Sequence, residues 1–532
     1  MATSVLAPTL EAPPPRTVRK APAPIAAASR SLPRRVRTLR RLVPLGAILA
    51  LQAFLSYRLI SSNTAFLDEA TYLGAGHQLL HAWLHGGPDL HYATYFSGAP
   101  VIYPVIGALF DSLGGLEAAR LFSMAVMLGA TVLAYASGRR LAGTAAGWLA
   151  AGVFCTLQGT QFLGAFATFD AMSLGLVAMA TWIVVRAGTA RPRPRAWIYA
   201  AAPVMIFANA TKYASAIYDP VILAVAFFVL AHSSGWRTAV RVTATLTSIA
   251  VAIVAALLAF AGRSYIVGIT STTTSRAKGT ASASAVLHES LGWIGSVIVL
   301  AVLAAVALTV AAFCHRVTWA VALLGLVLAA ATLLAPLNQA RIQTTTSLSK
   351  HVDFGAWFGA VLAGILLSYV VGHGWRSIWR YLLLMPLLVP MLVAGSDQAS
   401  SEFGHWFNST RLIATLRPLV DHNSGPVLVD DVSVPEYYLG AGINPLRWVG
   451  TFYLSFHASP SGPALVGIPA YLAAVRESYF SVIALDWGDA KPVDTAVAQA
   501  ISLNHRYHYY TKVFSHNALG NSAYVIWRLE RT

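Results

Sequence analysis

The chain alternates long apolar runs with short polar turns over most of its length. A bilayer core about 30 Å thick is crossed by a helix of about 20 apolar residues. The runs therefore predict a polytopic α-helical membrane protein with about eleven transmembrane helices. The expected spans lie at roughly residues 42–62, 116–138, 144–160, 168–186, 196–211, 216–233, 239–261, 291–313, 317–336, 353–372 and 378–395.

The composition supports this interpretation and excludes a soluble protein. Of the 532 residues, 56% are hydrophobic and only 11% are charged, and the mean hydropathy is +0.61. Soluble domains carry about 25% charged residues, so a soluble chain of this length would be far more polar.

Basic residues indicate how the chain is oriented. The first 41 residues hold nine Arg or Lys against one acid, Glu11, and further Arg clusters fall in alternate turns. The positive-inside rule places all of these in the cytoplasm. The stretch 1–41 is predicted to be a disordered basic tail that contacts anionic lipid rather than nucleic acid. An odd number of crossings then places the C-terminus outside, on the side where almost all acids fall.

Two regions depart from the pattern of spans. The segment VIYPVIGALFDSL (101–113) is apolar but too short to cross, so we expect an interfacial or re-entrant helix there. From about residue 396 the spans stop, and we expect a small extracytoplasmic α/β domain over 396–532, which leaves 42–395 as the transmembrane domain. The expected strands of the α/β domain are 426–431, 480–487 and 523–529, and its expected helices are 469–479 and 493–507.

An adjacent acidic pair, Asp68 and Glu69, follows the first span at the predicted outer face. Two carboxylates beside a membrane are costly unless a site uses them, so the pair predicts catalysis or metal binding. The alternative is structural, because acids in a first helical turn interact favourably with the helix dipole. Asp170, at the outer start of a later span, has the same two interpretations: a partner of Asp68 in a metal or sugar site, or an acid that stabilises its own helix.

Several cations are expected on the outer side, against the positive-inside bias. They are Arg120, Lys212 and Lys350, and His351 lies next to the last of these. Binding of a lipid phosphate would explain them, and snorkelling towards lipid headgroups is the alternative.

Three histidines follow the acidic pair at intervals of four residues, which places them on one helix face. They are His77, His81 and His85. Together with Asp68, His77 and His81 could ligate a divalent cation, the only cofactor that the sequence suggests, although His-rich interfacial helices also occur without a metal. The Ser/Thr-rich outer turn 269–285 could close over a bound substrate.

The order of these motifs resembles the GT-C superfamily, in the branch of bacterial enzymes similar to protein O-mannosyltransferases and aminoarabinose transferases (family 39-like). The resemblance covers roughly residues 42–395, from FLDEATYLGAG through FATFDAMSLGL and ATKY to SLSKHVDFG. It implies that Asp68 is the catalytic acid, that Asp170 lies near the donor phosphate or a metal, and that Lys212 faces the carrier phosphate. It also implies a bacterial plasma membrane location. The chain departs from aminoarabinose transferases in YFSGAPVIYP, where those enzymes carry a Lys before the Pro-rich segment.

These features favour an inverting glycosyltransferase that moves a sugar from a polyprenyl-phosphate carrier to an envelope acceptor, a hydroxyl of a glycan, lipid or protein. Phosphate is a good leaving group, so one carboxylate base suffices. The expected partners are the polyprenyl-phosphate-linked sugar, the acceptor and membrane lipid, with no nucleic acid. The alternative is a glycolipid transporter or flippase, or a non-catalytic envelope-assembly protein. A transporter should show internal repeats and mid-membrane charges, whereas the ionisable residues of this chain gather at one face.

Overall fold

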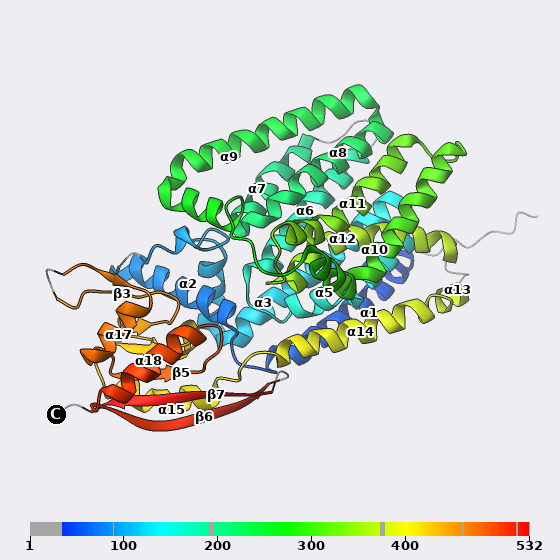
Figure 1. Cartoon of the computed structure of the whole chain (residues 1–532). Coiled ribbons are helices and arrows are strands. Elements are labelled where there is room, and N and C mark those ends of the chain that lie inside the picture. Colours follow the sequence, from blue (N-terminus) through cyan, green and yellow to red (C-terminus); the bar gives the residue numbers. More distant parts are fainter. Residues whose placement is uncertain are drawn as a thin grey trace, which may run out of the picture. The chain divides into compact units, whose positions relative to one another are not determined.

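The computed structural model describes residues 34–88, 90–190, 196–372, 378–459, 462–517 and 520–530 (Figure 1). Residues 44–532 form one compact unit. The predicted basic tail lies outside the described residues up to residue 33. Helix α1 (Arg34–Ile60) begins inside the stretch predicted to be disordered, because its Arg and Leu residues are good helix formers.

Eight helices in the described part of the chain are long and apolar enough to cross a membrane, which confirms a multi-pass membrane protein. They are Leu42–Ile60 within α1, α3 (Tyr103–Ala142), α6 (Phe169–Gly188), Tyr213–Ser234, which joins a 3₁₀ turn to α8 (Asp219–Ser234), α9 (Trp236–Thr272), α10 (Ala283–Phe313), α11 (Trp319–Arg341) and α12 (Leu348–Val371).

The number is smaller than the predicted eleven because three expected spans form shorter or more polar elements. Two are the short apolar helices α4 (Thr144–Thr156) and Ala196–Thr211, which ends in α7 (Ala201–Thr211). The third, 378–395, divides into α13 (Ile378–Leu382) and α14 (Met385–Gly404). Helix α14 continues into the polar residues SDQASSE and runs across the domain boundary expected at residue 396, which stays a prediction.

The expected short helix at 101–113 forms the first part of α3. The backbone leaves the helical conformation at Gly114 and Gly115, and φ of 66° at Gly115 is in the left-handed region that glycine tolerates. The segment is therefore a helix set off from the following span by a kink, while its position at the membrane surface stays a prediction.

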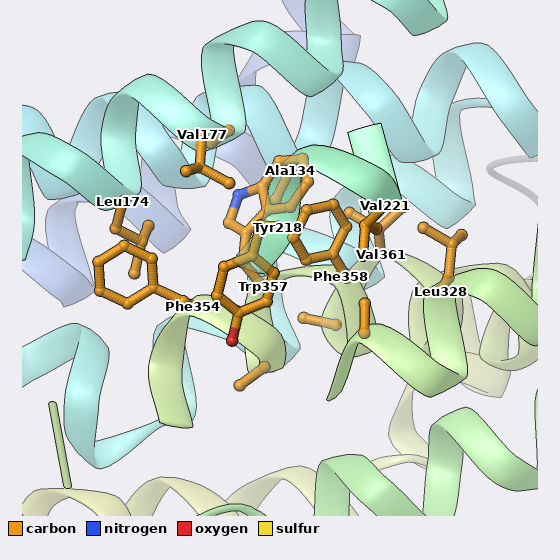
Figure 2. Close-up of a cluster of buried hydrophobic side chains, with 14 of the residues drawn as sticks. Ala134, Leu174, Val177, Tyr218, Val221, Leu328, Phe354, Trp357, Phe358 and Val361 are labelled. Atoms are coloured by element: carbon orange, nitrogen blue, oxygen red, sulfur yellow. The ribbon is translucent and has the colours of Figure 1, made fainter. Parts of the chain in front are cut away.

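Helix α12 lies at the centre of the helical core. Buried residues make up 83% of its apolar stretch, against 11% in α9. Gly364 has no space for a side chain, because a Cβ would lie 2.5 Å from the Ala146 carbonyl oxygen of α4. Small residues of this kind let membrane helices pack closely. Figure 2 shows the aromatic part of this core, where the Tyr218 ring stacks on Phe354 and Phe358 at 5.9 and 5.7 Å between centroids.

The C-terminal region is an α/β sandwich. Its five-stranded sheet has the order β2-β1-β5-β7-β6, with β2, β1 and β5 parallel and β7 and β6 antiparallel. The strands are β1 (Val427–Val429), β2 (Trp448–Val449), β5 (Val482–Leu485), β6 (Tyr507–Asn517) and β7 (Gly520–Leu529), and β3 (Ser455–Phe456) and β4 (Leu465–Val466) form a separate pair. The expected strands and helices are all present, but the helix expected at 493–507 ends early and β6 is not predicted, because its alternating polar residues lack a strong apolar period.

Helices cover both faces of this sheet. Helix α15 (Thr410–Asp421) packs its apolar side on one face, through Leu412, Leu416 and Val420. Helices α17 (Ile468–Arg476) and α18 (Lys491–Leu503) pack on the other face, where Val497 and Ile501 of α18 join the core. The remaining short helices are α5 (Gln158–Leu163) and α16 (Ser433–Leu439).

Candidate active site

Four charged residues from four separate elements form one ionic cluster. Asp68 lies in the first turn of α2 (Leu67–His85), Asp170 in the first turn of α6, Lys212 at the end of α7, and Lys350 in the first turn of α12. Lys350 Nζ lies 2.6 Å from Asp68 Oδ2, and Lys212 forms an ion pair with Asp170. Lys350 also attracts Asp170, and Lys212 attracts Asp68, so the four charges interact as a group.

Exposure distinguishes the members of this cluster. The Asp68 side chain is 31% exposed, whereas those of Lys350, Lys212 and Asp170 are 8%, 5% and 1% exposed. Asp68 is therefore the carboxylate of the cluster that a second substrate can reach.

Aromatic rings hold the two lysines in place. The Lys212 ammonium lies 4.8 Å from the centroid of the Phe169 ring, and that of Lys350 lies 5.2 Å from the centroid of Phe166. The Tyr72 ring packs on Phe169 at 4.5 Å between centroids. Burial, with the negative charges of Asp68 and Asp170, raises the pKa of the Tyr72 phenol well above its usual value, so this hydroxyl stays protonated beside the cluster.

The second acid of the pair, Glu69, has a different environment. Both Glu69 and its partner Arg120 have completely buried side chains, 2.6 Å apart at Arg120 Nη2 and Glu69 Oε2. The Glu69 carboxylate also accepts hydrogen bonds from Arg120 Nε and from the Phe66 and Ala167 amides. Arg120 donates in addition to the carbonyl oxygens of Ile60, Asn63 and Thr64. The pair thus ties α2 and α3 to the loops that precede α2 and α6.

The segment YFSGAPVIYP (95–104) lies against the end of α7. The Ala99 amide donates to the Ala210 carbonyl oxygen at 2.7 Å, and the Tyr213 amide donates to the Ser97 carbonyl oxygen at 2.8 Å. A Cβ at Gly98 would lie 2.0 Å from the Thr211 carbonyl oxygen. Only glycine allows the two backbones to approach this closely. The contact lies at Thr211, directly before Lys212.

A cavity of about 980 Å³ opens beside Lys212. Its lining includes the apolar side chains of Val254, Leu257, Leu258 and Phe260 of α9. It also includes the cations Lys212, Arg276 and Arg341, together with His351 and one acid, Asp219. A lining that contains both apolar side chains and cations suits the two halves of a lipid phosphate.

Two cavity residues, Arg341 and Arg276, have no role in the sequence-based prediction, in which Arg276 is only one member of the turn 269–285. The sequence feature that could have identified Arg341 is its position at the predicted outer end of a span, against the positive-inside bias. Thr272, Thr273 and Thr274 line the cavity together with Arg276, so the turn contributes directly to its wall.

The histidines of α2 lie apart from the ionic cluster. His77 Nε2 lies 2.6 Å from Asp111 Oδ2, and Tyr437 of α16 donates to Asp111 Oδ1 at 2.5 Å. His81 and His85 stack on one another at 4.9 Å between ring centroids. Among the described residues, one group of three or more His, Cys, Asp or Glu side chains is arranged as metal ligands are, and it consists of Asp430, Asp486 and Asp494.

Comparison with known proteins finds a family match over part of the chain and a similar fold over most of it. Residues 99–260 match the family model of dolichyl-phosphate-mannose-protein mannosyltransferases. No curated protein matches the chain significantly.

Three solved structures have a similar fold. ArnT from Cupriavidus metallidurans bound to undecaprenyl phosphate has a TM-score of 0.57 at 13% identity, covering 91% of this chain and 98% of that chain. The Archaeoglobus fulgidus oligosaccharyltransferase AglB with an inhibitory peptide and a dolichol-phosphate has a TM-score of 0.55 at 11% identity, covering 92% and 74%. An Archaeoglobus fulgidus oligosaccharyltransferase in complex with Zn and sulfate has a TM-score of 0.52 at 14% identity, covering 90% of this chain and 72% of that chain.

Proposed function

We propose that this chain is a GT-C membrane glycosyltransferase and that it transfers a sugar from a polyprenyl-phosphate carrier to a hydroxyl of an envelope acceptor. The partial family match and the fold support this proposal. The observation that carries the proposal is the ionic cluster of Asp68, Lys350, Asp170 and Lys212 beside a cavity that both apolar residues and cations line. The reaction takes place on the outer face of the membrane, as the distribution of Arg residues predicts.

The cavity receives the donor. The isoprenoid chain lies along the apolar residues of α9, and the phosphate lies among Lys212, Arg276 and Arg341. Charge-assisted hydrogen bonds from these cations hold the phosphate and stabilise the charge that it gains as it leaves. Support comes from the lining of the cavity and from the carrier phosphates named for the ArnT and AglB structures.

Asp68 acts as the single base. The acceptor oxygen attacks the anomeric carbon, the bond from that carbon to the phosphate oxygen breaks, and its electron pair leaves with the phosphate. The proton of the acceptor hydroxyl passes to the Asp68 carboxylate, which the hydrogen bond from Lys350 Nζ holds in position. Attack on the side opposite the phosphate inverts the configuration of the sugar.

Glu69 and Arg120 are structural in this proposal. Each oxygen of the Glu69 carboxylate already accepts two hydrogen bonds, and neither side chain is exposed. Asp170 orients Lys212 towards the phosphate, and His351 lines the same wall. The lysines that pair with Asp68 and Asp170 supply the positive charge that a divalent cation would otherwise bring to these two acids.

The test uses purified full-length protein in nanodiscs with radiolabelled undecaprenyl-phosphate mannose and a membrane extract as the source of acceptor. Asp68→Asn should lower transfer by roughly 10²-fold or more, because the general base is lost, while binding of undecaprenyl phosphate stays normal. Glu117→Gln removes an exposed acid of α3 and should keep full transfer.

Three results would contradict the proposal. A folded Asp68→Asn variant with near-normal transfer would remove Asp68 from the role of base. Wild-type protein that moves labelled lipid across the bilayer without transferring its sugar would identify a flippase instead. Wild-type protein that does neither would leave an envelope-assembly role.

A further inference from the structure

We propose that Asp430, Asp486 and Asp494 form a site for a divalent cation with oxygen ligands, such as Mg²⁺ or Ca²⁺, in the C-terminal α/β region. This site is separate from the ionic cluster of the membrane helices. Its ligand atoms, one carboxylate oxygen from each residue, all lie within 4.8 Å of one another.

The fold explains why these residues meet. Asp430 directly follows β1, Asp486 directly follows β5, and the two strands are parallel neighbours, with Val429 paired with Ala484. Ligands of open α/β sheets bind at the carboxyl ends of parallel strands, which is where both carboxylates lie. Asp494 reaches the same edge from the first turn of α18.

Asp494 points to a ligand independently of this clustering. Its side chain is completely buried, and neither carboxylate oxygen has a hydrogen-bond partner. The Trp487 amide and the Asp430 carboxyl lie near Asp494, but neither makes a hydrogen bond of good geometry with it. Burying a carboxylate without a partner is costly, and a bound cation removes that cost.

A proton shared between Asp430 and Asp494 is the competing explanation, because burial raises the pKa of both carboxyls. The hydrogen bonds of Asp430 argue against it. Its Oδ1 accepts from the Thr451 hydroxyl at 2.5 Å, and its Oδ2 accepts from the Asp486 amide at 2.8 Å. Two accepting oxygens are typical of an ionised carboxylate, and each retains a second lone pair for a cation.

The surroundings leave the negative charge of the group unbalanced. None of the ion pairs found among the described residues includes Asp430, Asp486 or Asp494. Three carboxylates with no nitrogen or sulfur ligand suit a hard cation rather than zinc. The bound cation would hold α18 against the edge of the sheet.

The experiment strips full-length protein with EDTA, titrates it with Tb³⁺, and then competes with Ca²⁺ or Mg²⁺. Trp487, next to Asp486, should sensitise the Tb³⁺ emission. We expect saturable emission that Ca²⁺ or Mg²⁺ displaces, and a thermal midpoint that Ca²⁺ raises in the wild type. Asp494→Asn should weaken Tb³⁺ binding at least tenfold, and Asp489→Asn, which changes an exposed acid two residues from Trp487, should leave it unchanged.

A second variant of a proposed ligand controls for misfolding of Asp494→Asn. Asp486 is only half-buried, so Asp486→Asn should fold and should also weaken binding at least tenfold. Equal Tb³⁺ binding by wild type, Asp494→Asn and Asp486→Asn would overturn the proposal. A second pair of results would also overturn it: no cation stabilises the wild type, and Asp494→Asn melts at a higher temperature than the wild type. This pair is expected if Asp430 and Asp494 share a proton. Sugar transfer plays no part in this measurement, so the outcome is independent of the proposed catalytic function.

Discussion

The substitution Glu69→Gln should unfold the protein rather than stop its chemistry, although Glu69 is adjacent to the proposed base. Each oxygen of the Glu69 carboxylate accepts two hydrogen bonds. Oε1 accepts from Arg120 Nε and the Ala167 amide, both at 2.8 Å. Oε2 accepts from Arg120 Nη2 at 2.6 Å and from the Phe66 amide at 3.0 Å.

A glutamine cannot replace this carboxylate in either orientation of its amide. Whichever oxygen becomes an NH₂ group, it then faces two donors, so two hydrogen bonds are lost. The Arg120 guanidinium also loses its counter-charge while its side chain is completely buried. Removing one partner of a buried ion pair costs about 3–5 kcal/mol, a large fraction of the about 5–15 kcal/mol that stabilises a typical protein.

The assay compares folded yield and thermal unfolding in detergent for the wild type, Glu69→Gln, Arg120→Gln and the double variant. Both single variants should lose most of the folded protein, and the double variant should be more stable than the sum of the two losses predicts. Glu117→Gln is the matched control, because it changes an exposed acid and should leave stability within about 1 kcal/mol. A Glu69→Gln variant that melts like the wild type but transfers no sugar would refute the structural role of Glu69 and identify it as catalytic.

Three other parts of the structure can be tested by substitution or by pH. Lys212→Ala should weaken binding of undecaprenyl phosphate at least tenfold in a titration, whereas Lys278→Ala, which removes an exposed cation of the turn 269–285, should not. Gly98→Ala should reduce the folded yield, because its Cβ would lie 2.0 Å from the Thr211 carbonyl oxygen, whereas Gly74→Ala meets nothing within 4 Å and should fold normally. Burial raises the pKa of Glu436 from 4.5 to about 7, so the folded protein binds this proton more tightly and thermal stability should fall as pH rises from about 4.5 to 7. Glu436→Gln should flatten that pH dependence, and an unchanged slope would show that other groups cause it.

The helical architecture and the positions of most spans could be predicted, because twenty-residue apolar runs have few alternative structures in a membrane. The exceptions are apolar runs whose flanking residues change where the helix ends. The run 144–160 ends at Thr156, where the chain turns before α5, and α14 extends into polar residues that no hydrophobic window includes. In the C-terminal region, β6 escapes prediction because it pairs with β7 through its backbone while its side chains stay mostly polar.

The candidate site could be predicted only in part. The common position of Asp68, Asp170, Lys212 and Lys350 at the outer ends of spans predicts that they lie on the same side of the membrane. Their pairing could not be foreseen, because it depends on how α2, α6, α7 and α12 pack together. The same holds for Glu69 and Arg120, which are separated by fifty-one positions in the chain and whose mutual contact exists only in the folded bundle.

The pairing also changes the explanation of the cations that the sequence predicts on the outer side. Lys350 is neutralised by Asp68 and Lys212 by Asp170, so these four residues together carry no net charge. Arg120 is likewise neutralised by Glu69. The positive charge left to a donor in the cavity therefore comes from Arg276 and Arg341, which line its wall with Lys212.

This arrangement suits a reaction in which the leaving phosphate becomes more negative. A site with a large excess of positive charge would bind the product phosphate too tightly. A neutral cluster beside two additional cations attracts the phosphate more strongly mainly as negative charge develops on its leaving oxygen. The proposed base, Asp68, belongs to this neutral cluster through its ion pair with Lys350. Arg276 and Arg341 should therefore affect release of undecaprenyl phosphate as well as binding of the donor, and the balance between the two sets the rate of turnover.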